Sequence, residues 1–161
     1  MAGFNRLSRD AAMEVVRSCL AVERWWVAVV DARPYRDHDH LVAIAWGAAC
    51  PLTDAELVEA LTDHVATLPR DWLRRTSGTP RSGVLEQPYS SALAYEVAVE
   101  VEQYENQFGR PFVIFTTGKS TSEVADQLHH RLGNDGSAED TVIGGQLREI
   151  ALLRLSRQVL P

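Results

Sequence analysis

The feature that most constrains the fold is the abrupt end of a long helical pattern at Gly109 and Pro111. Glycine is favoured just past a helix end because the left-handed conformation costs it little, and Pro111 disfavours helix for the residue before it. A β-branched and aromatic run follows over residues 112–117, and Ser120 with Glu123 then has the spacing of a capping box. The backbone groups of an apolar extended segment need partners, and a bound ligand can supply them. We therefore expect a short extended segment near 112–117.

Elsewhere the hydrophobic pattern is helical over nearly the whole chain. A second capping box is formed by Thr53 and Glu56. Helices are expected after Ser8, from about Glu23 to Ala32, from near Asp37 to Pro51, after Thr53, from Ser90 or Ser91 to Phe108, after Ser120 and after Ser137, with a loop over 74–83. The sequence predicts an all-α fold of about seven or eight helices in one domain spanning residues 1–161.

Composition excludes several classes of protein. The net charge of −6 argues against a nucleic-acid surface, which needs clustered Lys and Arg. No apolar run approaches the roughly 18 residues of a membrane helix, so no membrane partner is expected. Two cysteines, Cys19 and Cys50, are too few for a disulfide scaffold and predict free thiols in a reducing compartment. These observations together predict a soluble cytoplasmic protein.

Three short motifs invite a chemical interpretation, and two of them fail. The Gly118-Lys119-Ser120 turn lacks the earlier glycine of a phosphate loop, because that position is Val113. The pair His38 and His40 supplies two ligands without a third at a usual metal spacing, so no metal site is predicted.

His64 is different because it falls on the apolar stripe of its helix, with Leu57 and Leu61. A polar group at such a position must find a partner or take part in chemistry. A hydrogen-bonded structural histidine and a catalytic one both remain open on this pattern alone.

The order of several short motifs resembles the 2-oxo-4-hydroxy-4-carboxy-5-ureidoimidazoline (OHCU) decarboxylase family, whose members form (S)-allantoin in urate breakdown. The likeness covers nearly the whole chain. The motifs are Phe4-Asn5, Arg24-Trp25, Arg33-Pro34-Tyr35, Leu52 to Leu57 with Glu59-Ala60-Leu61 and His64, Glu86-Gln87, Tyr104 to Ile114, Arg131 to Asp135 and Ile150 to Leu155.

The resemblance implies a cofactor-free decarboxylase that acts on a small molecule as a homodimer. According to this resemblance, His64 would donate or relay a proton and Arg131 would help to hold negative charge. The backbone of residues 112–116 would form hydrogen bonds with the amide edges of the substrate. The implied catalytic residues are His64, Glu86 and Arg131, and the implied substrate-binding positions are Gly83, Gln87, Phe112, Ile114 and Thr116.

Two departures from the family pattern leave alternatives open. The proline that usually follows the histidine is absent after His64, and a shifted alignment would place Leu68, before Pro69, at the histidine position. Gly83 stands where a serine is expected, which removes one possible substrate hydrogen bond. The alternatives are a repurposed member acting on another small cyclic carboxylated compound and a non-catalytic module on the same scaffold.

Overall fold

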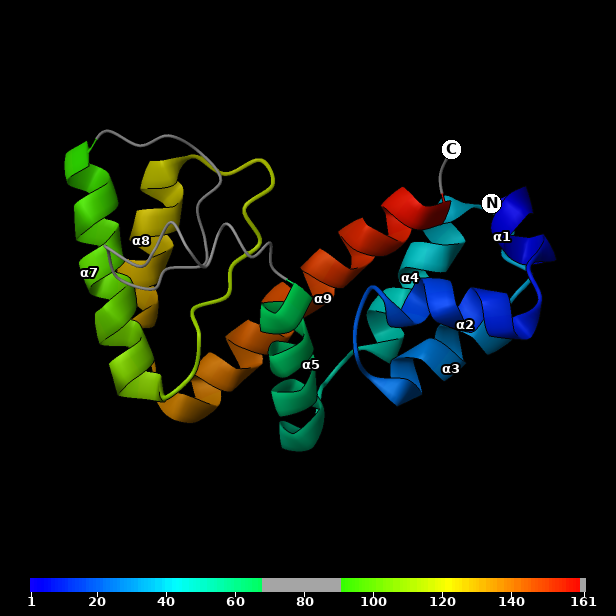
Figure 1. The fold of residues 1–161 in the computed structure, drawn as a ribbon, viewed down its shortest axis with the longest axis horizontal. Coiled ribbons are helices and arrows are strands. Elements are labelled where there is room, and N and C mark those ends of the chain that lie inside the picture. Colours follow the sequence, from blue (N-terminus) through cyan, green and yellow to red (C-terminus); the bar gives the residue numbers. More distant parts are fainter. Residues whose placement is uncertain (68–90, 160–161) are drawn as a thin grey trace. The chain divides into compact units, whose positions relative to one another are not determined.

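The computed structural model describes residues 1–67 and 91–159, and these residues form eight helices without a strand (Figure 1). The helices are α1 (Ala2–Arg6), α2 (Arg9–Arg17), α3 (Glu23–Asp31), α4 (His38–Ala48), α5 (Asp54–Thr67), α7 (Ser91–Phe108), α8 (Thr121–Arg131) and α9 (Gly136–Val159). The predicted all-α class is therefore confirmed, and the eight helices of the described residues agree with the expected number.

Local caps explain where most of these helices begin. The side chains of Ser8 and Asp37 accept backbone hydrogen bonds at the starts of α2 and α4. At α8, Ser120 and Glu123 form the predicted reciprocal capping box. The last helix differs from expectation: it begins at Gly136 because the Asp135 carboxylate accepts from a first-turn N–H, so Ser137 does not precede it.

The chain divides into two compact units. The first contains residues 1–66 and 144–161, and the second contains residues 67–143, so α9 contributes to both. The single domain predicted over 1–161 stays a prediction. None of the helices in the described part of the chain is both long and apolar enough to cross a membrane.

In the first unit, α2 packs on α3 and α3 packs on α4. The fully buried Trp25 anchors this packing by donating its indole N–H to the Ala45 carbonyl of α4, 2.8 Å away. The same α3 bears Arg24, which binds the carbonyls of Ala48 and Pro51 as well as the Glu56 carboxylate. One arginine therefore ties the end of α4 to the start of α5.

In the second unit, α7 packs against α8, and residues 111–116, which follow α7, are neither helix nor strand. Gly109 takes the left-handed conformation, with φ of 65°, and so ends α7 as expected. Phe112 and Ile114 are buried with α7 and α8 side chains in one hydrophobic cluster. A non-helical segment thus lies near the predicted position, although Thr117 belongs to a turn, and the core of its own unit holds it.

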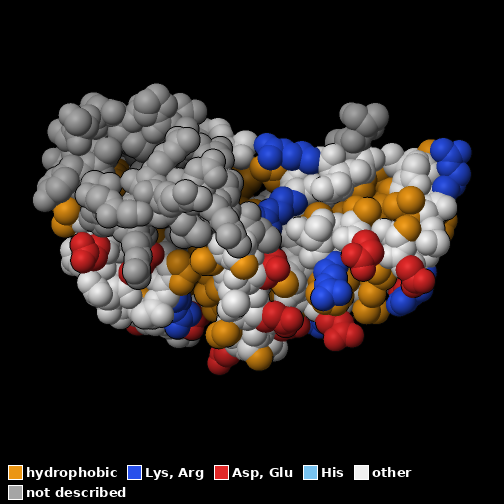
Figure 2. All heavy atoms as spheres, in the orientation of Figure 1, with side chains coloured by type: hydrophobic (Ala, Val, Ile, Leu, Met, Phe, Trp, Pro, Cys, Tyr) orange, Lys and Arg blue, Asp and Glu red, His pale blue; other side chains and the backbone are white. Residues whose placement is uncertain are grey.

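On the face of the molecule that Figure 2 shows, neither positive nor negative side chains dominate among the described residues. In Figure 2 the described Lys and Arg side chains are interspersed with Asp and Glu side chains. This mixture agrees with the acidic net charge and with the absence of a basic track on that face among the described residues.

Candidate functional site

A histidine and an arginine meet in the first unit. His64 lies in α5 and Arg154 in α9, and the Arg154 Nη2 atom is 3.3 Å from the His64 Nδ1 atom. Both side chains are half-buried. The neighbouring α5 residues Leu57 and Leu61 are buried, as the stripe predicted, so α5 directs His64 toward the protein interior.

The contact fixes the tautomer of the neutral imidazole. A guanidinium has only donors, so Nδ1 of His64 must accept and Nε2 must carry the hydrogen. Burial and, secondly, the Arg154 charge lower the pKa of His64 to about 4, against the opposing charge of Asp63. His64 is therefore neutral at neutral pH in the ligand-free protein.

Arg154 is also held from a second side. Its Nη1 atom donates to the Cys19 carbonyl at 3.4 Å, across α9 and the end of α2. Arg154 belongs to the C-terminal motif Ile150 to Leu155, but it is not among the site residues that the sequence predicts. A signal was present, because Arg154 shares its helix face with the buried Leu147 and Ala151, and a charge on an apolar stripe is the pattern that singled out His64.

The start of α5 is fixed by a capping box and an ion pair. Thr53 and Glu56 exchange side-chain to backbone hydrogen bonds at 2.8 and 3.3 Å, which confirms the predicted box. Arg24 binds both oxygens of Glu56, and this side-chain bond is the largest cause lowering the pKa of Glu56 to about 2. The helix that carries His64 is therefore anchored at its first turn.

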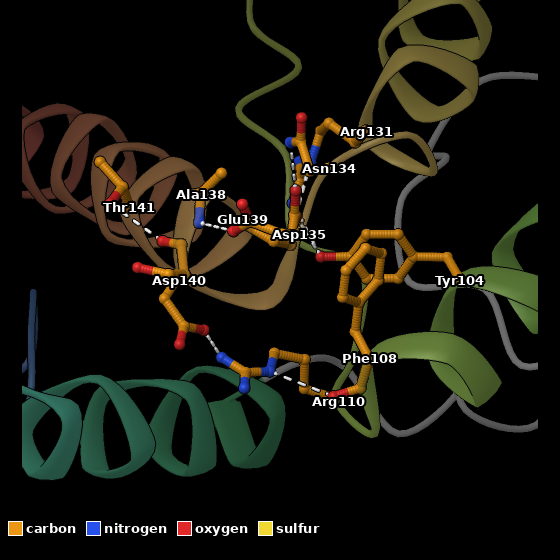
Figure 3. A network of polar contacts seen from close by, with 11 residues as sticks. Tyr104, Phe108, Arg110, Arg131, Asn134, Asp135, Ala138, Glu139, Asp140 and Thr141 are labelled. Atoms are coloured by element: carbon orange, nitrogen blue, oxygen red, sulfur yellow. Dashed lines mark hydrogen bonds and ion pairs between the residues drawn. The ribbon is translucent and has the colours of Figure 1, made fainter.

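A second polar cluster lies in the second unit and contains Arg131 (Figure 3). Arg131 and Glu139 are both buried, and the Arg131 Nε atom donates to the Glu139 carboxylate at 2.8 Å. Tyr104 also donates to this carboxylate, as does Asn134, at 2.8 Å. The Arg131 Nη1 atom donates to the Val113 carbonyl at 2.7 Å. Glu139 was not predicted, because nothing local in the sequence pairs it with Arg131.

The predicted backbone-binding segment begins within this cluster. The Phe112 ring lies under the Arg131 guanidinium, 4.5 Å from its central carbon to the ring centroid. Ile114 is buried, whereas Thr116 is exposed and its carbonyl accepts the Lys119 N–H. The structure places these residues in one continuous strip, and their binding of a substrate stays a prediction.

The remaining predicted site residues cannot be placed. Gly83, Glu86 and Gln87 lie outside the described residues, as does Leu68 of the alternative alignment. Their roles stay predictions.

The residues first considered for metal binding have other surroundings. The Nε2 atom of His38 forms a hydrogen bond of 2.8 Å with the Ser156 hydroxyl. Within residues 1–67 and 91–159, no group of three or more His, Cys, Asp or Glu side chains is arranged to hold a metal ion.

Comparisons with known proteins agree on one family. Residues 5–156 match the sequence model described as OHCU decarboxylase. The structure of an (S)-allantoin synthase superposes with a TM-score of 0.71 at 14% identity, over 98% of this chain and 53% of that one. An OHCU decarboxylase crystallised in the presence of (S)-allantoin superposes with a TM-score of 0.60 at 15% identity, over 88% and 94% of the two chains.

The coverage and the identity of these matches determine what they show about the chain. The chain spans about half the length of the (S)-allantoin synthase structure. At these identities, the structural likeness shows a shared fold. No curated protein sequence matches the chain significantly.

Proposed function

The chain belongs to the OHCU decarboxylase family, and from this membership we propose that it decarboxylates OHCU to (S)-allantoin without a cofactor. The observation that carries the proposal is the contact between His64 and Arg154, 3.3 Å apart on α5 and α9. This pair combines a proton carrier with a cation suited to a carboxylate.

The reaction needs little covalent help from the protein. When the bond between the ring carbon and the carboxylate breaks, carbon dioxide leaves and the bonding electron pair moves into the ring, toward its carbon–nitrogen double bond. One proton must then reach the carbon that bears the ureido group, on one face only. An anion site, a dry environment and one oriented acid therefore suffice.

We propose that Arg154 receives the carboxylate, because it is the arginine that contacts the imidazole. Arg131 directs its guanidinium to Glu139, Tyr104 and the Val113 carbonyl. Arg154 instead lies beside the imidazole, and a charged hydrogen bond from it would contribute about 1.5–3 kcal/mol. We therefore assign anion binding to Arg154.

The same contact would couple proton uptake to substrate binding. Without a ligand, burial and the Arg154 charge keep His64 neutral. A carboxylate against Arg154 offsets that positive charge and raises the pKa of His64, so the imidazole carries a proton in a larger fraction of the complexes. Carbon dioxide leaves as a neutral molecule, so the negative charge stays on the ring that has accepted the electron pair. The imidazolium donates its proton to the ring carbon that bears the ureido group, while the neighbouring hydroxyl becomes a carbonyl and its hydrogen passes to the ring nitrogen.

The other family roles are retained as parts of this proposal. Glu86 and Gln87 would hold ring or ureido groups, and the backbone of 112–116 would pair with amide edges. We also propose a homodimer in the cytoplasm, supported by the family likeness and, for the compartment, by the free thiols of Cys19 and Cys50.

The test is a stereochemical assay. OHCU is generated from urate by the two upstream enzymes, the protein is added, and the optical activity of allantoin is followed by circular dichroism. Rapid formation of one enantiomer is expected. A racemate formed at the spontaneous rate by folded protein would reject the proposal.

Three variants then locate the chemistry. His64→Gln should reduce the rate by about 10²–10⁴-fold, because it removes the proton carrier. Arg154→Met should reduce kcat/KM by roughly 10–100-fold, through loss of a charged hydrogen bond. Arg157→Met, an exposed change on the same helix, is the matched control and should leave the rate unchanged. Wild-type activity in folded His64→Gln protein would rule out the assigned role.

One observation favours a second candidate function. His64 lies in the last turn of α5, but the proline expected after it is replaced by Val65, and the helix continues through Ala66 to Thr67. A family member repurposed for another small cyclic carboxylate would retain the His64–Arg154 pair with altered surroundings. Saturable inhibition by such carboxylates, with no acceleration of OHCU decay, would favour this reading.

A further inference from the structure

The contacts of the Arg131 cluster, formed by Arg131, Glu139, Tyr104 and Asn134, indicate a role other than direct binding of the substrate. Arg131 is only 5% exposed and Glu139 is fully buried. The Nε atom binds Glu139, Nη2 binds Glu139 and the Tyr104 hydroxyl, and Nη1 binds the Val113 carbonyl. The guanidinium therefore faces protein groups on both of its terminal nitrogens.

The cluster holds the extended segment at two consecutive residues. The Val113 carbonyl accepts from Arg131 at 2.7 Å, and the Phe112 ring lies under the same guanidinium at 4.5 Å. Tyr104 closes the other side, with its ring 5.0 Å from that of Phe112 in an edge-on arrangement. Both the backbone and the side chain of the segment are thus tied to one cation.

Glu139 in turn fixes the orientation of that cation (Figure 3). It lies in the first turn of α9, where a carboxylate is favoured by the helix dipole. Asn134 donates to its second oxygen at 2.8 Å, so both carboxylate oxygens are bound. Burial and the bond to Glu139 raise the pKa of Tyr104, which keeps its hydroxyl a donor.

We propose that Arg131 and Glu139 are positioning residues, which hold the backbone of residues 112–116 in the conformation that binds the amide edges of the ureido ligand. They do not contact the carboxylate of the substrate. This inference rests on the proposed function for the identity of the ligand. It does not depend on that function for the effect on the segment itself.

The experiment uses the full chain and compares two ligands. OHCU carries the carboxylate and (S)-allantoin lacks it. Substitution of a residue that binds the carboxylate weakens the binding of OHCU alone. Substitution of a residue that positions the backbone weakens the binding of both ligands. Arg131→Lys keeps the charge but loses the fork that reaches Val113, and Glu139→Gln keeps the size but loses the charge that orients Arg131.

Three measurements are made on each variant: the KM for OHCU, the affinity for (S)-allantoin by calorimetry, and amide hydrogen exchange of residues 113–116. Each variant should weaken the binding of both ligands on the order of tenfold, and it should accelerate amide exchange of residues 113–116 by a similar factor. The double variant should be no worse than the worse single variant, because both act through one contact. Arg110→Lys is the matched control, since Arg110 pairs with Asp140 in the same unit.

Folding is separated from positioning by a further variant. Arg131→Met with Glu139→Leu replaces the ion pair by apolar groups, which a buried site tolerates. If this protein melts like the wild type yet shows faster exchange at 113–116 and weaker (S)-allantoin binding, the proposal is supported. Tyr104→Phe, which keeps the ring, provides the same comparison where the double replacement does not fold.

Two results would overturn the inference. Unchanged exchange of residues 113–116 in folded Arg131→Lys and Glu139→Gln proteins would show that the cluster does not hold the segment. A loss confined to OHCU, with (S)-allantoin bound normally, would make Arg131 a carboxylate ligand. If wild-type protein processes no OHCU and binds no (S)-allantoin, the proposed function fails, while the exchange result still decides whether the cluster holds the segment.

Discussion

Acidification should destabilise this protein through His64, at a pH where its carboxylates are still largely ionised. The pKa of His64 is lowered from 6.5 to about 4 in the folded protein, first by burial and then by Arg154. As the pH falls from 6.5 toward 4, the unfolded chain takes up a proton at His64 and the folded chain does not. The stability contribution of the neutral imidazole is present above pH 6.5 and is lost across this interval.

The magnitude follows from the two pKa values. One pKa unit corresponds to about 1.4 kcal/mol, so the interval from 6.5 to about 4 corresponds to roughly 3 kcal/mol. The side chain is only half-buried, and solvent screening reduces the expected loss to about 2 kcal/mol. His64→Gln removes the titrating group, so its free energy of unfolding should lack this loss.

Urea denaturation followed by tryptophan fluorescence, at pH values from 7.5 to 4, measures the difference between wild type and variant. The exposed His130 provides the control, because His130→Gln should retain the wild-type slope. NMR titration of the His64 ring gives its pKa directly. An NMR pKa near 6.5, or equal pH slopes in wild type and His64→Gln, would refute the reasoning.

Further predictions concern the charge beside His64, two glycines and the ion pair of Glu56. Arg154→Met should raise the pKa of His64 while leaving it below 6.5, because burial is the larger cause; NMR titration would show this, and an unchanged value would mean that the two groups do not interact in solution. Gly109→Ala should destabilise the protein by about 1 kcal/mol, since φ is 65° there and no neighbouring atom obstructs a methyl group. Gly47→Ala, in the last turn of α4 where no neighbouring atom obstructs a methyl group, should instead stabilise by roughly 0.5–1 kcal/mol, and equal effects of the two changes on urea midpoints would contradict the conformational argument. Glu56→Gln should lower the free energy of unfolding by about 1 kcal/mol at pH 7 and by nearly nothing at pH 2. The pKa of Glu56 is lowered to about 2, so the stability that its carboxylate contributes is lost as the pH falls through that value. An equal cost at both pH values would exclude the ion pair as the source of this stability.

Local interactions explain why helix positions could be predicted from the sequence. The Ser120–Glu123 box joins residues three apart, and the left-handed turn at Gly109 depends on a single residue. Such signals are visible in any window of a few residues. The start of α9 was misplaced by two residues because Asp135, Gly136 and Ser137 all suit a helix start, and only the observed bond to Asp135 chooses among them.

The candidate site was only partly predictable, because its contacts join distant parts of the chain. His64 was found because it interrupts an apolar stripe, but its partner Arg154 lies 90 residues further on. Likewise, Arg131 binds Glu139, and no local pattern in the sequence identifies that pairing. Side-chain periodicity predicts which face is buried, and it does not predict which buried charges meet.

The two bonds that hold Arg154 have a consequence for affinity. Fixing a long arginine side chain costs about 2 kcal/mol in rotamer entropy. Because Cys19 and His64 already hold the guanidinium from two sides, most of that loss occurs when the chain folds. An arriving anion meets a cation that is already ordered, so more of the electrostatic attraction remains as net binding free energy.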